Sequence, residues 1–247
     1  MSVVGQVREI VRYPVKSMAG VPAASAFLGW HGLAGDRRFA FRRAGAAGGM
    51  PWLTASRLPE LLLYQAIRFE ESGGEPLPTH IRTPDGATVE LGSAELIREI
   101  AGRFGSGVEL LRLNQGIFDE GTVSVIALST IWGIGRESGV ELDRRRFRAN
   151  IFVETDRKET FLEDDWVGGT LSFGEADPRP AVHVTMRDER CVMINLDPDT
   201  AKQDARIMKT VVRLNENTAG VYATVVRTGT IRVGDPVDLI PGASSGG

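Results

Sequence analysis

The single thiol of this chain stands next to a guanidinium group. Cys191 is the only cysteine among 247 residues, and Arg190 precedes it directly. A neighbouring cation favours the thiolate form, which attacks electrophiles and binds soft metal ions. A lone cysteine is also often a small buried apolar residue, and a nucleophilic Cys–His pair with His183 would need contact in space. From the residues alone, a buried structural thiol is the favoured interpretation of Cys191, with a metal ligand or nucleophile and a Cys–His pair as alternatives.

Two loops combine basic side chains with turn residues in a way that suits an anion. Lys16 and Ser17 follow a strand stopped by Pro14, and Arg37 follows the turn Gly32-Leu33-Ala34-Gly35-Asp36. Ammonium, guanidinium and successive backbone N–H groups all bind phosphate oxygens. The same patterns are also typical of polar surface turns.

The densest basic run is Arg144-Arg145-Arg146-Phe147-Arg148. It could form an anion pocket, a docking patch for an acidic partner or a solvated surface. The run Glu163-Asp164-Asp165 precedes Trp166 and a glycine-rich turn, which predicts a loop rather than a general-acid pair. The whole chain has 29 Lys and Arg against 32 Asp and Glu, a net charge of −3, which argues against a nucleic-acid-binding protein.

Several protein classes lack their signatures in this chain. One cysteine excludes an internal disulfide framework, and three histidines do not supply a zinc-type cluster. No dinucleotide, Walker, His-Glu-x-x-His or nucleophile-elbow motif occurs. No segment approaches the roughly 18 apolar residues that span a bilayer, and the first residues do not resemble a signal peptide. We expect a cytoplasmic protein that binds neither membrane nor nucleic acid.

Short runs of β-forming residues, broken by Gly, Pro and Asp turns, predict a β-dominated α+β protein. Pro84-Asp85-Gly86 predicts a hairpin turn. Strands are expected at residues 3–13, 24–28, 37–43, 61–69, 80–83, 87–91, 108–113, 124–128, 150–154, 181–185, 192–196, 221–226 and 230–233. Cys191 is thus expected just before or at the start of a strand.

Three helices are expected between these strands. Ser93 is predicted to cap a helix over 94–104 that Gly105 ends. Ser129 is predicted to cap a second helix that reaches about Glu137. Asp199 or Thr200 is predicted to cap a third helix that runs towards Val212.

Six motifs occur in an order that matches a known family. They are Tyr13-Pro14-Val15-Lys16-Ser17 with Gly20; Gly32-Leu33 with Gly35-Asp36-Arg37; Arg146-Phe147-Arg148-x-Asn150-Ile151; Glu163-Asp164-x-Trp166; Arg190-Cys191 with Asp197-Pro198-x-Thr200; and Gly229-x-Ile231-x-Val233-Gly234-Asp235-Pro236-Val237. Together they resemble the MOSC family, named for the C-terminal domain of molybdenum cofactor sulfurase, and its amidoxime-reducing component branch above all.

The resemblance implies a MOSC β-barrel packed against a smaller, β-rich N-terminal domain. The N-terminal MOSC-associated β-barrel domain is expected at residues 1–112 and the MOSC domain at 113–241. Residues 242–247 are expected to be a disordered tail.

The resemblance also implies a molybdenum cofactor (molybdopterin) bound between the two domains. Cys191 matches the cysteine that coordinates molybdenum and is the expected catalytic residue. The expected cofactor-binding residues are Lys16, Ser17, Arg37, Thr122, Arg148, Asn150, Arg190 and Tyr222. The family's usual proline after Arg-Phe-Arg is Ala149 here, and its usual glycine after Asp-Pro-x-Thr is Ala201, so these two loops are expected to differ locally.

The implied activity is molybdenum-cofactor-dependent reduction of N-hydroxylated compounds such as amidoximes and hydroxylamines. No pyridoxal-phosphate domain is expected in this chain, and one cysteine cannot hold an iron–sulfur cluster. Electrons are therefore expected from a separate protein of ferredoxin, flavoprotein or cytochrome type. A carrier of the cofactor or of sulfur, and an anion-binding barrel module, are the alternatives.

Overall fold

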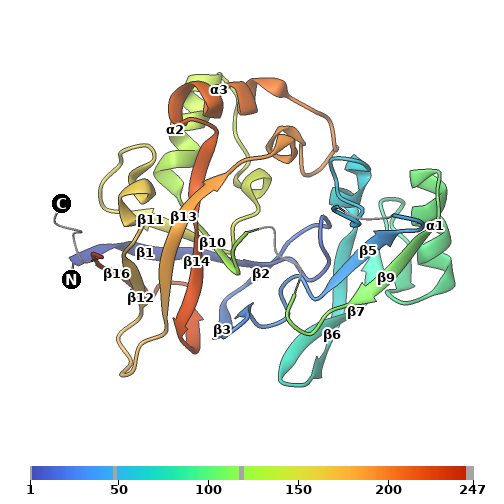
Figure 1. Cartoon of the computed structure of the whole chain (residues 1–247), viewed down its shortest axis with the longest axis horizontal. Helices are drawn as coiled ribbons and strands as arrows, with labels where there is room; N and C mark the ends of the chain where they lie inside the picture. The colour runs from blue at the N-terminus through green and yellow to red at the C-terminus, as the bar shows by residue number, and fades with distance from the viewer. Residues whose placement is uncertain (1, 47–48, 117–119, 243–247) are drawn as a thin grey trace.

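The computed structural model describes residues 2–46, 49–116 and 120–242. Its largest part is a closed β-barrel, with strand order β11-β10-β14-β13-β12-β16-β1 and closure through the pairing of β1 with β11 (Figure 1). The ring strands are β1 (Ser2–Arg12), β10 (Val123–Ala127), β11 (Ile151–Thr155), β12 (Thr170–Phe173), β13 (Ala181–Glu189), β14 (Thr218–Arg227) and β16 (Pro236–Ile240). The predicted β-dominated α+β class is confirmed.

The two-residue period of a strand sorts the side chains of the barrel between two cores. Along β10, Val123, Val125 and Ala127 join the interior cluster, whereas Ile126 joins a second cluster outside the ring. Successive strand residues point to opposite faces, so both faces of β10 are buried. Closure of the ring leaves no unpaired edge among its strands.

The first strands of the chain belong to the same barrel as the last. β1 pairs antiparallel with both β11 and β16. β2 (Val21–Ala23) pairs with β1, while β3 (Ser25–Gly29) lies between β15 (Gly229–Arg232) and β4 (Gly32–Leu33). The barrel therefore draws strands from both sides of residue 112. The division into domains at that residue stays a prediction.

A smaller unit stands beside the barrel, at the right in Figure 1. It contains β5 (Phe39–Arg43) paired with β9 (Val108–Arg112), and a sheet of β6 (Gln65–Ser72), β7 (Glu75–Arg82) and β8 (Thr88–Glu90). A short 3-10 helix, η1 (Pro59–Leu63), and α1 (Ala94–Phe104) cover its core. Ser93 caps α1 by accepting from the Leu96 N–H at 3.2 Å, and Gly105 ends it in a left-handed conformation, as predicted.

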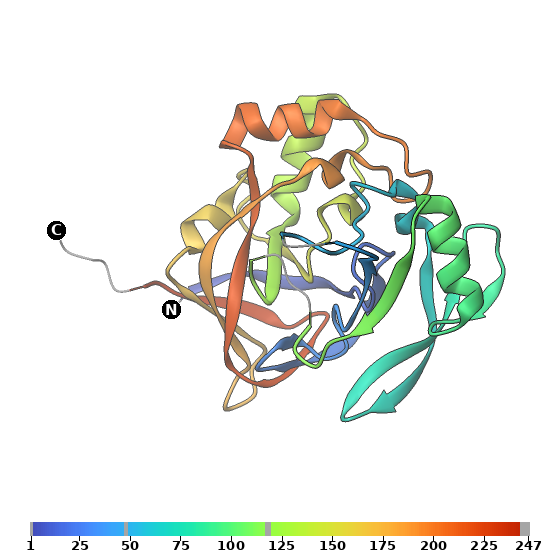
Figure 2. The same ribbon diagram turned by 45° about the vertical axis from the view of Figure 1, so that its right-hand side comes forward.

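Two further helices pack against the outside of the barrel (Figure 2). α2 (Leu128–Ser138) and α3 (Ala205–Asn215) contact each other. Their buried apolar side chains form part of the second hydrophobic cluster, outside the ring. Three 3-10 helices connect the strands: η2 (Arg144–Phe147), η3 (Leu162–Trp166) and η4 (Val192–Asn195). In the described ranges, no helix is both long and apolar enough to cross a bilayer.

The strand predicted at 192–196 is wrong, because this segment forms η4. The Asn195 side chain accepts from the Met208 N–H at 3.0 Å, and its backbone carbonyl accepts from the Asp204 N–H at 2.8 Å. These bonds to the start of α3 replace the hydrogen bonds of a sheet ladder. Cys191 therefore follows the end of β13 and opens a helical turn.

Two helix caps and one strand start also differ from expectation. Ala127 is the N-cap of α2, and the Ser129 hydroxyl is buried against Thr155. Asp204 caps α3, because its carboxylate accepts from the Arg206 N–H at 3.1 Å, whereas Asp199 and Thr200 belong to the preceding turn. The predicted strand 61–69 starts only at Gln65, since η1 occupies the residues before it. The predicted tail falls almost wholly on 243–247, outside the described residues.

Candidate functional site

A cavity of about 480 Å³ opens beside Cys191, between the barrel and the smaller unit. We name it the Cys191 cavity. Most of the predicted site residues line it: Lys16, Ser17, Arg37, Arg148, Arg190, Cys191 and Tyr222. These residues come from five separate parts of the chain, and the fold brings them to one concave surface.

Cys191 lines this cavity and is exposed. The alternative of a buried structural thiol is therefore wrong. His183 lies near the start of β13, whereas Cys191 follows the end of that strand, and His183 does not line the cavity. The fold does not bring the suggested Cys–His pair together.

Arg190 is buried beside the thiol as a fixed cation. Its guanidinium forms an ion pair with the buried Asp188 carboxylate and donates to the Phe147 carbonyl. Burial has the largest single effect and lowers the pKa of Arg190. The combined attraction of Asp188, Tyr222 and Cys191, with the hydrogen bond to Asp188, outweighs burial and holds that pKa above its ordinary value. Its Nε–H is buried and has no hydrogen-bond partner among the described residues.

Asn150 and Asp36 hold Arg37 in place. The Arg37 guanidinium donates to Asn150 Oδ1 at 3.2 Å and forms an ion pair with Asp36, whose other oxygen accepts from the Tyr13 N–H at 2.6 Å. Asn150 is buried and does not line the Cys191 cavity. Its side chain positions Arg37, a role different from the direct contact predicted.

Tyr13, which the site prediction did not include, supports two of the guanidinium groups. The Arg148 guanidinium lies 4.3 Å from the centre of the Tyr13 ring, and that of Arg37 lies at 5.0 Å. The phenol donates to the Ala149 carbonyl at 3.3 Å. Burial raises the pKa of Tyr13 to about 12, so the ring stays neutral beneath two cations, as a cation–π arrangement requires.

Three cavity residues have left-handed backbone conformations. The φ angles are +68° at Ser17, +49° at Arg37 and +52° at Arg148. Such conformations cost a residue with a Cβ of order 1 kcal/mol or more, and they cluster at binding and catalytic sites. These three backbone conformations occur in three separate turns, and the side chains of all three residues line the same cavity.

Ion pairs divide the arginine run of 144–148 between several tasks. Arg144 pairs with Glu9, and Arg145 pairs with Asp143 and Asp199. Because these exposed guanidinium groups are already paired with carboxylates, they offer less positive charge to an acidic docking partner.

Arg146 bridges η2 to the turn after η4. It donates to the Asn195 carbonyl at 2.9 Å and to Asp197 Oδ2 at 2.8 Å. Asp197 Oδ1 in turn accepts from the Thr200 N–H at 2.9 Å. The motif Asp197-Pro198-x-Thr200 thus shapes the turn that follows Cys191.

The structure places Thr122 outside the Cys191 cavity. Its hydroxyl donates to the Ala223 carbonyl at 3.4 Å, and its carbonyl lies where a Cβ on Gly32 would clash. Ser124 lines the cavity instead and donates to Asp188 at 3.0 Å. The pattern Thr122-Val123-Ser124 gives no signal to choose between the two hydroxyls, because both face the same side of the strand.

Glu163 is a buried carboxyl group that lines neither described cavity. It accepts from the Thr130 hydroxyl at 2.6 Å and from the Gly220 N–H at 3.1 Å. Burial raises its pKa to about 7. It connects η3 to α2 and β14, which is a structural role.

The comparisons with known proteins agree with this fold. The family profile of the MOSC domain matches residues 116–238. The crystal structure of the YuaD protein from Bacillus subtilis is similar, with a TM-score of 0.51 and 14% identity over 96% of this chain and 95% of that one. YiiM from Geobacillus stearothermophilus aligns with 49% of this chain and 54% of its own, at 16% identity and a TM-score of 0.34. No curated protein matches this chain in sequence.

Proposed function

Because the chain belongs to the MOSC family, which is associated with molybdenum cofactors, we propose that it is a molybdenum-cofactor-dependent reductase of N-hydroxylated compounds. Amidoximes and hydroxylamines are the proposed substrates. The two electrons come from a separate redox protein of ferredoxin, flavoprotein or cytochrome type.

The side chains of the Cys191 cavity fit such a group. Cys191 offers a soft sulfur ligand, the type that suits molybdenum. Arg37, Arg148 and Lys16 offer the charges that bind a terminal phosphate. The buried Nε–H of Arg190, which has no partner in the part of the chain that the structure describes, is a donor that a ligand in the cavity would satisfy.

When bound, the cofactor would supply the two-electron chemistry that converts an N–OH group and two protons into N–H and water. The chain holds the surroundings fixed. Asp188 and the Phe147 carbonyl immobilise Arg190 beside the thiol, and Tyr13 supports Arg148. Preorganised charges of this kind need no rearrangement when a ligand arrives.

The observation that carries the proposal is the exposed thiol on a cavity lined by buried or stacked arginines. The first test is molybdenum content by mass spectrometry, with protein from a host that makes the cofactor. We expect near-stoichiometric metal in the wild type and loss of most of it in Cys191→Ala. Val192→Ala, at the exposed neighbouring position, is the control and should keep its metal.

The second test is turnover of benzamidoxime with an artificial electron donor. Loaded wild type should form benzamidine, and Cys191→Ala should not. If the host loads another molybdoenzyme but not this chain, the cofactor assignment fails. If the chain is loaded and yet does not turn over N-hydroxylated substrates, the reductase assignment fails alone.

An exposed thiol also favours a second candidate, a carrier of the cofactor or of sulfur on Cys191. A carrier must present its cargo to another protein, and Cys191 is accessible. This candidate predicts a loaded protein that lacks turnover and passes molybdenum to an apo-molybdoenzyme.

A further inference from the structure

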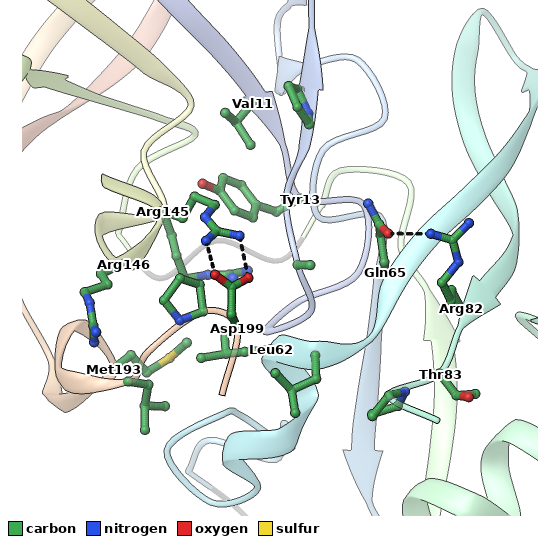
Figure 3. Close-up of a pocket in the computed structure, with 18 of the residues that line it drawn as sticks. Val11, Tyr13, Leu62, Gln65, Arg82, Thr83, Arg145, Arg146, Met193 and Asp199 are labelled. Atoms are coloured by element: carbon green, nitrogen blue, oxygen red, sulfur yellow. Dashed lines mark hydrogen bonds and ion pairs between the residues drawn. The ribbon is translucent and has the colours of Figure 1, made fainter. Parts of the chain in front are cut away.

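A second cavity, of about 420 Å³, lies between the barrel and the smaller unit (Figure 3). Val11, Tyr13, Leu62 and Met193 contribute apolar walls, and we name it the Leu62 cavity. Small-molecule pockets have volumes of roughly 300–1,000 Å³. Apart from Arg148, none of the predicted site residues lines it.

The charges on one side of the Leu62 cavity neutralise one another. Arg145 donates to the two oxygens of Asp199 at 2.9 and 2.5 Å, the pair drawn at the left of Figure 3. Arg146 donates to Asp197 at 2.8 Å. These two pairs therefore offer little net charge to a ligand. The Arg148 guanidinium, which also lines the cavity, lies over the Tyr13 ring and donates to the Met18 carbonyl at 2.8 Å.

Arg82, on the other side, is different. Its guanidinium donates to the neutral Gln65 Oε1 at 3.4 Å, as Figure 3 shows. Among the described residues, 2–46, 49–116 and 120–242, Gln65 is the hydrogen-bond partner of this guanidinium, and no carboxylate is paired with it. Since Gln65 accepts with its oxygen, its amide N–H groups are further donors at this end. The polar end of the cavity is thus cationic and rich in donors.

We propose that the Leu62 cavity is a second small-molecule site, which binds a carboxylate with a compact apolar body. Arg82 and Gln65 hold the carboxylate, and Leu62, Met193 and Tyr13 contact the apolar part. The groups that bind the carboxylate belong to the smaller unit. The apolar side chains come from both the smaller unit and the barrel, so the ligand contacts both units.

The Leu62 cavity and the Cys191 cavity share part of their walls. Arg146, Arg148 and Met193 line both cavities. Tyr13 lines the Leu62 cavity with a ring that lies 4.3 Å from the Arg148 guanidinium. A ligand here contacts the support of Arg148 without occupying the space beside Cys191. Because binding is measured on the chain itself, the test does not depend on the proposed function.

The test is isothermal titration calorimetry on the full chain with 3-phenylpropanoate and its neutral counterpart 3-phenylpropanamide. We expect the wild type to bind the carboxylate at least about tenfold more tightly than the amide, since charge-assisted hydrogen bonds are the stronger ones. Arg82→Gln should remove this preference. Arg42→Gln, at an exposed strand position outside both cavities, should keep it.

Two further variants locate the bound probe. Ala19→Phe places a large side chain in the wall of the Leu62 cavity and should abolish binding of both probes. Lys16→Gln alters only the Cys191 cavity and should bind the carboxylate as the wild type does. Binding that is lost in Lys16→Gln and kept in Arg82→Gln overturns the proposal. So does wild-type protein that binds neither probe at millimolar concentration.

Discussion

The methyl group of Ala201 makes the backbone conformation of its turn less favourable. It has a φ of +56°, a left-handed conformation, at a position where the family commonly has glycine. A Cβ in this region costs about 1 kcal/mol. We expect Ala201→Gly to raise the free energy of unfolding by about 1 kcal/mol, as measured by urea denaturation.

The matched control for Ala201→Gly is Ala101→Gly, within α1. There the backbone is helical, and glycine should lower the free energy of unfolding by about 1 kcal/mol. Equal effects at the two positions would show that the left-handed turn carries no strain.

Glu163 makes stability depend on pH near neutrality. Its pKa is about 7 in the folded chain and about 4.5 for an ordinary glutamate. Between these values only the folded state holds the proton, so this contribution is complete below pH 4.5 and is lost as pH rises through 7. The total change is roughly 3 kcal/mol, at about 1.4 kcal/mol per pH unit.

Glu163→Gln should remove this dependence. We expect the free energy of unfolding of Glu163→Gln, relative to wild type, to rise between pH 5 and pH 8. Asp165→Asn, in the same turn but exposed, is the control and should follow the wild-type profile. Parallel wild-type and Glu163→Gln curves over this range would refute the assignment.

At the scale of elements, the Arg146 bridge fixes the segment that starts with Cys191. Arg146→Gln removes donors to both Asn195 and Asp197, at a cost of about 2 kcal/mol in the free energy of unfolding. We expect faster amide hydrogen exchange over residues 192–200 than in wild type.

The neighbouring residue provides a matched control for the bridge. Arg145→Gln breaks only exposed ion pairs, which are worth about 1 kcal/mol or less. Its exchange over 192–196, which excludes the Arg145 partner Asp199, should stay close to that of wild type. If both variants behave alike, the bridge does not hold η4.

The elements that sequence reasoning predicted well are those with local signals. The α1 helix has its cap residue, its periodicity and its terminal glycine within one short segment, and the hairpin at 84–86 has its own turn residues. The segment 192–196 has β-forming residues, yet Asn195 bonds to the start of α3. Partners that lie elsewhere in the chain override local preference, and the sequence pattern does not reveal them.

The same distinction holds for the site. Family motifs predicted the residues that line the Cys191 cavity, because each motif carries its own side chains. They did not predict Tyr13 as a support for Arg37 and Arg148, or that Asn150 acts through Arg37. The contacts of Arg37 with Asn150 and of Tyr13 with the Arg148-Ala149 segment join residues more than a hundred positions apart.

At the scale of the whole molecule, β1 is essential to the barrel although it is far in sequence from its partners. Residues 113–242 alone lack β1, so β11 and β16 would have unpaired edges and the core would lack Val7 and Ile10. We expect this fragment to show no cooperative thermal unfolding by circular dichroism.

A permuted chain tests the same point with every barrel strand present. It joins residue 242 through a short linker to residue 2 and ends at residue 36. It should regain a cooperative transition that the shorter fragment lacks. A fragment 113–242 that unfolds cooperatively would support the predicted domain division instead.

The position of β1 between β11 and β16 also fixes an order of events during synthesis. The ribosome makes β1 before the other strands of the ring, but its partner Pro236–Ile240 is made more than 200 residues later. The ring therefore cannot close before β16 has emerged, and until then one edge of β1 has no partner strand. Contacts of such long sequence separation form slowly, and exposed edges promote aggregation. Slower elongation would prolong this stage, so the yield of folded protein should depend on chaperones more than its size suggests.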